Sequence, residues 1–387
     1  VNLEVLRRKN VLLLISGPNI SPDELSILEN IYTESRQHLI RPDRDGLYEI
    51  VWIPIVDPTV EWSEGQPLLK SFEALQRTMP WYSVYHPKLI QKPVIDFIKE
   101  EWHFRNKLIL VVLDPQGRVL SPNAIHMMWI WGSAAFPFTS LKEESLWRAE
   151  TFKLDLLVDG IDPVILNWIS EGRYIFLYGG DDIEWIRKFT SAARFVAKDS
   201  NIPVEMVYVG KSSHKEQVRK VTATITVEKI SHCWQDPAMV WFFWTRLHSM
   251  LFSKIQLNKV DDHDDVMQGI KKLLSYDKAG GWAVLAKGSE LVILGHGSTT
   301  LPTLLDYENT WKKEVVIKGF DRSIKDYHSM LHNIANPCSR FDFPVTAGTG
   351  RIPQSMKCAE CDRMMVKHTT FTCCHDHEDV PETNINY

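Results

Sequence analysis

The sequence predicts an α/β fold, a central mixed sheet flanked by helices, and predicts it twice along the chain. Short, nearly continuous apolar runs alternate with amphipathic helical patterns, as is typical of parallel strands covered on both faces. Each half closes with two strands joined by a tight turn, and the same element order starts again after residue 172. A length of 387 residues is enough for two such domains.

The first half opens with a predicted strand, Val11–Ser16, and a helix over Pro22–Gln37. Ser21 is a suitable N-cap, Pro22 fits the first helical position, and Glu24 completes a capping box. A second buried strand is predicted at Tyr48–Val56. The chain therefore begins with a strand, a helix and a parallel strand.

A third buried strand, Leu108–Leu113, ends in the turn Asp114–Gly117, and the chain returns in a short antiparallel strand, Arg118–Leu120. Further helices are predicted around Leu68–Arg77 and Val94–Trp102, and from about Asn123. The resulting order, two parallel crossovers followed by a hairpin, is thioredoxin-like.

The second half repeats this order after a helical connector, Glu143–Ser170. We expect four regions: domain 1 over residues 1–142, the connector over 143–172, domain 2 over 173–335, and a Cys-rich element with a tail over 336–387. The predicted elements of domain 2 are strands at Tyr174–Tyr178 and Val204–Val209, a helix from Ile183, helices at Ala238–Ser253 and Asp264–Leu274, a hairpin of Trp282–Ala286 with Leu291–Leu294, and a helix at Leu301–Lys313.

Composition excludes several classes of protein. A net charge of −5 gives no basic surface for nucleic acid, and no apolar run approaches the ~20 residues that span a bilayer. Six cysteines in so long a chain do not form a disulfide framework and favour a reducing cytosol. The 14 tryptophans are predicted to be mainly core anchors. Because the chain starts at Val1 without an initiator Met or a signal-peptide pattern, we expect further sequence before it.

The junction Gly17–Ser21 is where a thioredoxin-type oxidoreductase carries its reactive C-x-x-C, and this chain has no cysteine before Cys233. Such enzymes also place a proline directly before the third strand, where this chain has Leu108. The corresponding junction of the second half, Gly179–Asp182, has no thiol either. Because dithiol chemistry needs a low-pKa thiolate, neither half is predicted to catalyse it.

The C-terminal cysteines and histidines are the candidate metal ligands. Cys358 and Cys361 form a C-x2-C pair, and Cys373, Cys374 and His377 follow within a short distance. Thiolate and imidazole ligands in this pattern suit tetrahedral Zn²⁺. The alternative is that these residues are free thiols, or thiols paired between chains, in a tail.

Two other polar segments fail the motifs that they resemble. Asp261–Asp265 is acidic, but Val266 and Lys272 stand where an EF-hand needs Gly and Glu, so a solvated helix N-terminus is the better interpretation. Gly295–Ser298 lacks the lysine of a phosphate-binding loop.

Long strings in this chain resemble the plant sieve element occlusion family, the phloem P-proteins that include forisome subunits. The matching strings are YEIVWIPIV at Tyr48–Val56, MPWYSV at Met79–Val84, LVVLDPQG at Leu110–Gly117, NAIHMMWIWG at Asn123–Gly132, LVDGIDP at Leu157–Pro163, YIFLYGGDDIEW at Tyr174–Trp185, VEMVYVGK at Val204–Lys211 and SYDKAGGWA at Ser275–Ala283. Met79–Trp81 and the Asp-Pro-x-Gly hairpin are also similar to nucleoredoxin and tryparedoxin. The terminal cysteines match the family pattern.

The resemblance implies a structural role and no catalytic residues. Members of the sieve element occlusion family assemble into filaments in the cytoplasm of phloem sieve elements and plug sieve plates after wounding. In legumes, forisomes swell in response to Ca²⁺. It therefore implies self-association, partnership with related subunits and a Ca²⁺ response of the assembly. Two alternatives stay open: a thiol oxidoreductase that uses Cys358 and Cys361, and a regulatory module that binds another protein through a thioredoxin-like groove.

Overall fold

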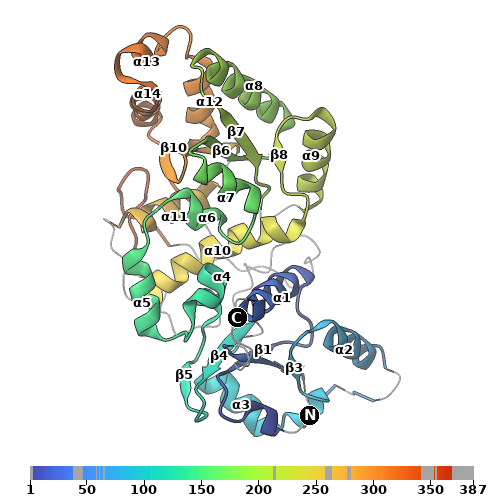
Figure 1. Cartoon of the computed structure of the whole chain (residues 1–387). Coiled ribbons are helices and arrows are strands. Elements are labelled where there is room, and N and C mark those ends of the chain that lie inside the picture. Colours follow the sequence, from blue (N-terminus) through green and yellow to red (C-terminus); the bar gives the residue numbers. More distant parts are fainter. Residues whose placement is uncertain are drawn as a thin grey trace. The chain divides into compact units, whose positions relative to one another are not determined.

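A mixed five-stranded sheet forms the centre of each of the two units into which the chain folds (Figure 1). A computed structural model of the chain describes residues 3–37, 47–57, 59–60, 62–63, 66–105, 107–211, 215–257, 264–276, 280–340, 353 and 355–367. The first unit holds the described residues up to Ala149 together with 252–257, and the second holds Glu150–Leu251 and the described residues after 263.

The first sheet has the strand order β3-β2-β1-β4-β5. Strand β1 is parallel to β2, which is parallel to β3, whereas β4 is antiparallel to both β1 and β5. The predicted parallel crossover and closing hairpin are confirmed. The strands are β1 (Val11–Ser16), β2 (Glu49–Pro54), β3 (Tyr82–Ser83), β4 (Ile109–Leu113) and β5 (Val119–Ser121).

Helices cover both faces of this sheet. On one face, Trp52 of β2 stacks on Phe72 of α2 at a centroid distance of 5.2 Å. On the other face, Ile15 of β1 and Ile109 of β4 pack in one apolar core with Ile95 of α3. The helices of this unit are α1 (Pro22–Gln37), α2 (Pro67–Thr78), α3 (Lys92–Glu101), α4 (Ile125–Trp131) and α5 (Ser140–Ala149), with single turns of 3-10 helix at η1 (Leu3–Leu6), η2 (Pro87–Leu89) and η3 (Gly132–Ala135).

The second sheet repeats the arrangement with the order β10-β9-β6-β7-β8. Strands β6, β7 and β8 are parallel, and β9 is antiparallel to its neighbours β6 and β10. The repeat of element order predicted from sequence is therefore present. The strands are β6 (Tyr174–Gly179), β7 (Val204–Tyr208), β8 (His232–Cys233), β9 (Trp282–Lys287) and β10 (Glu290–His296).

The helices of the second unit form two layers. In one layer Phe189 of α8, Leu304 of α12 and Ile324 of α14 pack in one apolar core with Phe176 of β6. In the other, Trp244 of α10 and Tyr276 of α11 contact Trp282 of β9. The helices are α6 (Leu154–Val158), α7 (Pro163–Ser170), α8 (Ile183–Asp199), α9 (Lys215–Glu228), α10 (Pro237–Gln256, in this unit up to Leu251), α11 (Asp265–Tyr276), α12 (Gly297–Leu305), α13 (Lys312–Lys318) and α14 (Phe320–Ala335).

The tryptophans lie in these cores, as predicted. Nine of the 14 are buried and the other five are partly buried. Trp52 and Trp282 are fully buried in their sheets, and Trp244 is 1% exposed. The tryptophans therefore stabilise the two units from inside.

Candidate functional site

The junction after β1 keeps its helix cap and holds no thiol. The Ser21 hydroxyl accepts a hydrogen bond from the Glu24 backbone N–H at 3.2 Å, and the Glu24 carboxylate accepts one from the Ser21 N–H at 3.2 Å. The predicted capping box is thus confirmed. The register of β1 with β4 ends where Ile15 pairs with Ile109. Leu108, the residue before Ile109, therefore lies next to the junction. A shallow cavity of about 530 Å³ lies beside it, lined by Asn19, Ile20, Pro22, Leu25, Ser71, Ala74, Leu75 and Thr78.

At the corresponding junction of the second unit, the backbones of two glycines, Gly180 and Gly281, approach each other closely. Gly180 has a φ of +151°, and a Cβ placed on it would lie 3.1 Å from the Cα of Gly281, the residue before β9. Asp182 caps α8 by accepting a hydrogen bond from the Glu184 N–H at 2.9 Å. Neither junction offers a nucleophilic sulfur, and each retains the contacts that begin its helix.

The described C-terminal cysteines form a compact turn in the second unit. Lys357 pairs with Met364 as an isolated antiparallel bridge. Inside it, the Cys358 N–H donates to the Arg363 carbonyl at 2.8 Å, and the Asp362 N–H donates to the Cys358 carbonyl at 3.0 Å. This cysteine turn, residues 357–364, places the two sulfurs of the C-x2-C pair on one short loop.

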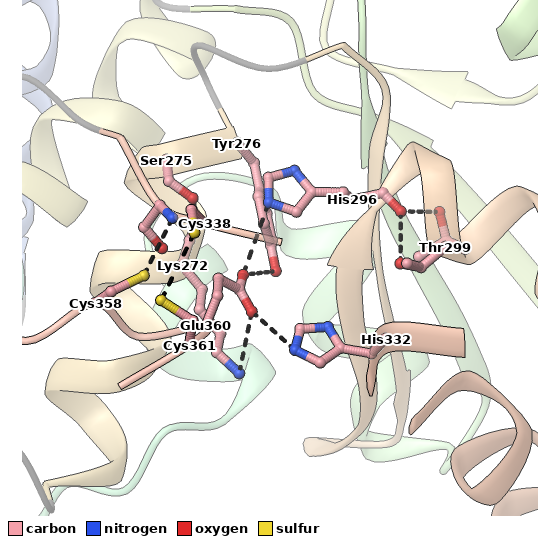
Figure 2. Close-up of polar contacts among 12 residues, drawn as sticks. Lys272, Ser275, Tyr276, His296, Thr299, His332, Cys338, Cys358, Glu360 and Cys361 are labelled. Carbon is pink, nitrogen blue, oxygen red and sulfur yellow. Dashed lines mark hydrogen bonds and ion pairs between the residues drawn. The ribbon is translucent and has the colours of Figure 1, made fainter. Parts of the chain in front are cut away.

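A third cysteine, Cys338, comes to the same place from the segment after α14 (Figure 2). Its Sγ lies 3.6 Å from the Sγ of Cys361, and the N–H of its neighbour Ser339 donates to the Sγ of Cys358 at 3.2 Å. Cys358 is buried, Cys361 is half-buried and Cys338 is exposed. The fold thus gathers three thiols from two segments.

The backbone around Cys358 favours its thiolate. Burial alone would raise the pKa of Cys358, but backbone N–H groups of Ser339, Cys361 and Glu360 directed at its sulfur together lower the pKa to about 7. The N–H of Arg363 favours the thiolate of Cys361 in the same way, but burial and the neighbouring thiols of Cys358 and Cys338 outweigh it and raise the pKa of Cys361. Of the two cysteines of the C-x2-C pair, Cys358 therefore ionises first.

Glu360, between the two cysteines of the pair, anchors the turn to the second unit. Its side chain is fully buried, and Oε1 accepts a hydrogen bond from the Tyr276 hydroxyl at 3.0 Å. Oε2 lies 3.4 Å from His332 Nε2 and 3.8 Å from Lys272 Nζ, and Oε1 lies 3.8 Å from His296 Nε2 (Figure 2). Donors from α11, β10 and α14 therefore surround one carboxylate.

Burial shifts the pKa values of two partners of Glu360, Tyr276 and His296. Burial, and then the charge of Glu360, raises the pKa of Tyr276 well above its usual value. Burial lowers the pKa of His296 more than the nearby carboxylate raises it. A second anchor is Lys271 of α11, whose Nζ donates to the Lys357 carbonyl at 3.0 Å. Polar and charged side chains of the second unit thus anchor the cysteine turn at Glu360 and Lys357.

Of the predicted zinc ligands, Cys358 and Cys361 lie together, and Cys373, Cys374 and His377 fall outside the described residues. Within the described part of the chain, no group of three or more His, Cys, Asp or Glu side chains is placed so that it could hold a metal ion. The acidic segment predicted at the start of α11 is described only for Asp264 and Asp265. Asp264 caps α11 by accepting a hydrogen bond from the Val266 N–H at 2.9 Å.

Sequence reasoning did not find Cys338 or the anchors of Glu360. Cys338 lies 20 residues before Cys358, too far for a recognised ligand spacing, and Tyr276, His296 and His332 are spread over 57 positions. The one local signal was an acidic residue inside the C-x2-C pair. Only the fold brings these groups together.

A family model described as the sieve element occlusion C-terminus matches residues 141–375. Protein SIEVE ELEMENT OCCLUSION B of Arabidopsis thaliana is 56% identical over 393 residues, which cover 100% of this chain and 53% of that relative. The chain belongs to the sieve element occlusion family. Protein SIEVE ELEMENT OCCLUSION A of the same plant is 39% identical over 386 residues, 97% of this chain and 45% of that relative.

This sieve element occlusion chain spans about half the length of the curated relatives that it matches. Among solved structures, a mutant tryparedoxin-I shares 17% identity at a TM-score of 0.27, covering 36% of this chain and 86% of the other, a likeness too weak to carry an argument. None of the described helices is long and apolar enough to cross a membrane.

Proposed function

We propose that this chain is part of a structural phloem protein that assembles, with copies of itself and related subunits, into filaments of the sieve-element cytoplasm and helps to occlude sieve plates after wounding. The observation that carries the proposal is the similarity over the entire chain to relatives named for sieve element occlusion. A role in phloem development and a Ca²⁺ response of the assembly belong to the same proposal.

In this proposal both units are thioredoxin-like scaffolds without redox chemistry. The strand orders β3-β2-β1-β4-β5 and β10-β9-β6-β7-β8, each with a parallel crossover and a closing hairpin, support this assignment. The thiol-free junctions support the loss of catalysis. The domain limits that we propose remain 1–142, 143–172, 173–335 and 336–387, with the Cys-rich element last.

Exposed apolar side chains on α13 supply a candidate assembly surface. Val316 is 89% exposed and Ile317 is 77% exposed, although α13 packs against α14. Adjacent apolar side chains left in water are typical of surfaces that bind another protein. We therefore place one contact between subunits at the Val316–Ile317 pair.

The test compares the wild-type chain with a Val316→Glu, Ile317→Glu double variant by sedimentation velocity and negative-stain electron microscopy, with and without Ca²⁺. We expect the wild type to form filaments or large oligomers, and the double variant to remain small at the same concentration. The matched control is Val227→Glu, which changes a side chain of α9 that is 81% exposed and should leave assembly unchanged.

A double variant that assembles like the wild type would remove α13 from the interface. If the wild-type chain instead stays a monodisperse monomer up to its solubility limit and binds one defined partner, the structural proposal is wrong for this chain. That outcome would favour a regulatory binding module, for which the cavity beside residues 17–21 is the candidate groove.

A further inference from the structure

Two thiols from separate segments of the chain lie within reach of a disulfide bond. The Sγ of Cys338, in the segment after α14, is 3.6 Å from the Sγ of Cys361 in the cysteine turn (Figure 2). Disulfide sulfurs lie about 2.05 Å apart, so a bond requires these two to approach by about 1.5 Å. Because Cys338 is exposed, its side chain can turn toward Cys361 without disturbing a packed core.

The exposure of the three described thiols of this cluster decides where an oxidant reacts. Cys338 is exposed and Cys361 is half-buried, whereas Cys358 is only 5% exposed. The rate of thiol–disulfide exchange depends on access to the reacting sulfur. A small oxidant therefore reaches the sulfur of Cys338 most easily, and the thiol beside that sulfur is Cys361.

The backbone around Cys358 favours its reduced form. Its sulfur accepts a hydrogen bond from the Ser339 N–H at 3.2 Å, and the N–H groups of Glu360 and Cys361 are also directed at it. These donors stabilise a thiolate. A stabilised thiolate is a weaker nucleophile and a better leaving group. A bond between Cys358 and Cys361 would therefore be displaced when Cys338 attacks the sulfur of Cys361.

We propose that Cys338 and Cys361 are a redox-sensitive pair, oxidised to a reversible disulfide by low-molecular-weight disulfides, while Cys358 stays reduced. The thiolate of Cys338 attacks one sulfur of the oxidant, which forms a mixed disulfide and releases one thiolate. The thiolate of Cys361 then attacks the sulfur of Cys338, which forms the protein disulfide and releases the second thiolate. The pair loses two electrons and two protons, and the oxidant becomes two thiols.

The disulfide would tie the segment after α14 to the cysteine turn, across 23 positions of sequence. The turn is already anchored to α11 and α14 through Glu360, so the bond would reinforce an existing contact. Because a cross-link restricts the unfolded chain, the oxidised form should be more stable than the reduced form. The pair lies outside both thiol-free junctions, and its oxidation is distinct from dithiol catalysis.

The test uses the purified chain in its unassembled form, so its result does not depend on filament formation. The chain is equilibrated in mixtures of reduced and oxidised glutathione, free thiols are alkylated, and the protein is digested with trypsin and analysed by mass spectrometry. Trypsin places Cys338 in the peptide 326–340 and the C-x2-C pair in the peptide 358–363. We expect these two peptides to be joined, with one alkylated thiol, in a fraction that rises with the proportion of oxidised glutathione and returns to zero in excess reductant.

Three variants identify the bonded sulfurs. Cys358→Ser should still form the joined peptides, because its sulfur takes no part in the bond. Oxidation should raise the melting temperature of the wild type, and Cys338→Ser should lose this increase. Cys233→Ser removes a buried thiol of β8 and should oxidise like the wild type. Circular dichroism checks that each variant is folded.

Three results would overturn the proposal. In the first, Cys338 of the wild type stays alkylated at every glutathione ratio. In the second, the bond forms within the peptide 358–363 and leaves Cys338 free. In the third, a folded Cys358→Ser chain forms no joined peptides, which would show that Cys358 and not Cys361 is the partner of Cys338.

Discussion

The imidazole of His126 is buried in the first unit, where it stacks on Phe252 at a centroid distance of 5.1 Å. Burial lowers the pKa of His126 to about 4 from the usual 6.5. Because the unfolded chain then binds a proton at a higher pH than the folded chain, protonation favours unfolding. The contribution of this histidine to stability is complete above pH 6.5 and is lost as the pH falls from 6.5 to 4.

We predict that His126→Phe reduces the acid sensitivity of the first unit. Between pH 7 and pH 5 the free energy of unfolding of the wild type should fall by about 2 kcal/mol more than that of the variant, which keeps an aromatic ring but cannot titrate. Urea denaturation at the two pH values, followed by fluorescence, measures this difference. Equal losses in both proteins would contradict the buried neutral state of His126.

At this scale, sequence predicted contacts that are local and missed contacts that are not. The Ser21–Glu24 capping box spans three residues, and its reciprocal hydrogen bonds follow from residue type alone. The anchors of Glu360 come from Tyr276 and His332, on two helices remote in sequence. A pattern in a single sequence cannot predict these contacts with Glu360, because they depend on how the sheet positions α11 and α14.

At the scale of elements, Gly297 shows why a glycine stands where β10 ends and α12 begins. A Cβ at Gly297 would lie 2.6 Å from the carbonyl oxygen of Gly281, and the Gly297 N–H donates to that same oxygen. Because the Gly281 carbonyl is part of the backbone, it cannot move away by a rotamer change as a side chain can. Gly297 thus allows α12 to start directly against the segment before β9. This close packing, and not phosphate binding, accounts for the glycine.

Gly297→Ala should therefore destabilise the second unit by about 1–3 kcal/mol, the usual cost of forcing extra atoms into a packed site. Thermal or urea denaturation checks it. Gly280→Ala is the matched control, because a Cβ there meets no atom within 4 Å, and it should be close to neutral. A Gly297→Ala protein as stable as the wild type would show that the close approach is relaxed at little cost.

Some long elements were predictable from sequence, and the shortest ones were not. The buried strand Val11–Ser16 and the helix Pro22–Gln37 have the predicted limits, because each carries a strong apolar pattern. Strands β3 and β8 have two residues each, too few for any period. Helix α9 was also missed, since its threonine-rich sequence has a low helix propensity, and so was the 16-residue helix α14. A single helix was predicted over Leu301–Lys313, where the chain forms α12 and α13.

For the molecule as a whole we predict no dithiol reductase activity. Neither junction has a thiol, and the remaining C-x2-C pair, Cys358 and Cys361, lies in the cysteine turn rather than at the start of a helix. In an insulin-reduction assay with dithiothreitol, the chain should not exceed the rate without protein, and Cys358→Ser should behave identically. Turnover that disappears in Cys358→Ser would instead support the thiol oxidoreductase alternative, which the low pKa of Cys358 would then explain.

The short outer strands of the two sheets limit how such a chain can polymerise. With two residues each in β3 and β8 and three in β5, these edges offer too few backbone groups to template another strand, and the longer edge β10 contacts α12 and α14. We therefore expect that a filament of this chain does not grow by adding strands to the edges of the described sheets. A fibre built from this chain would be a stack of intact folded subunits, without the ~4.7 Å cross-β reflection, and could disperse again without unfolding.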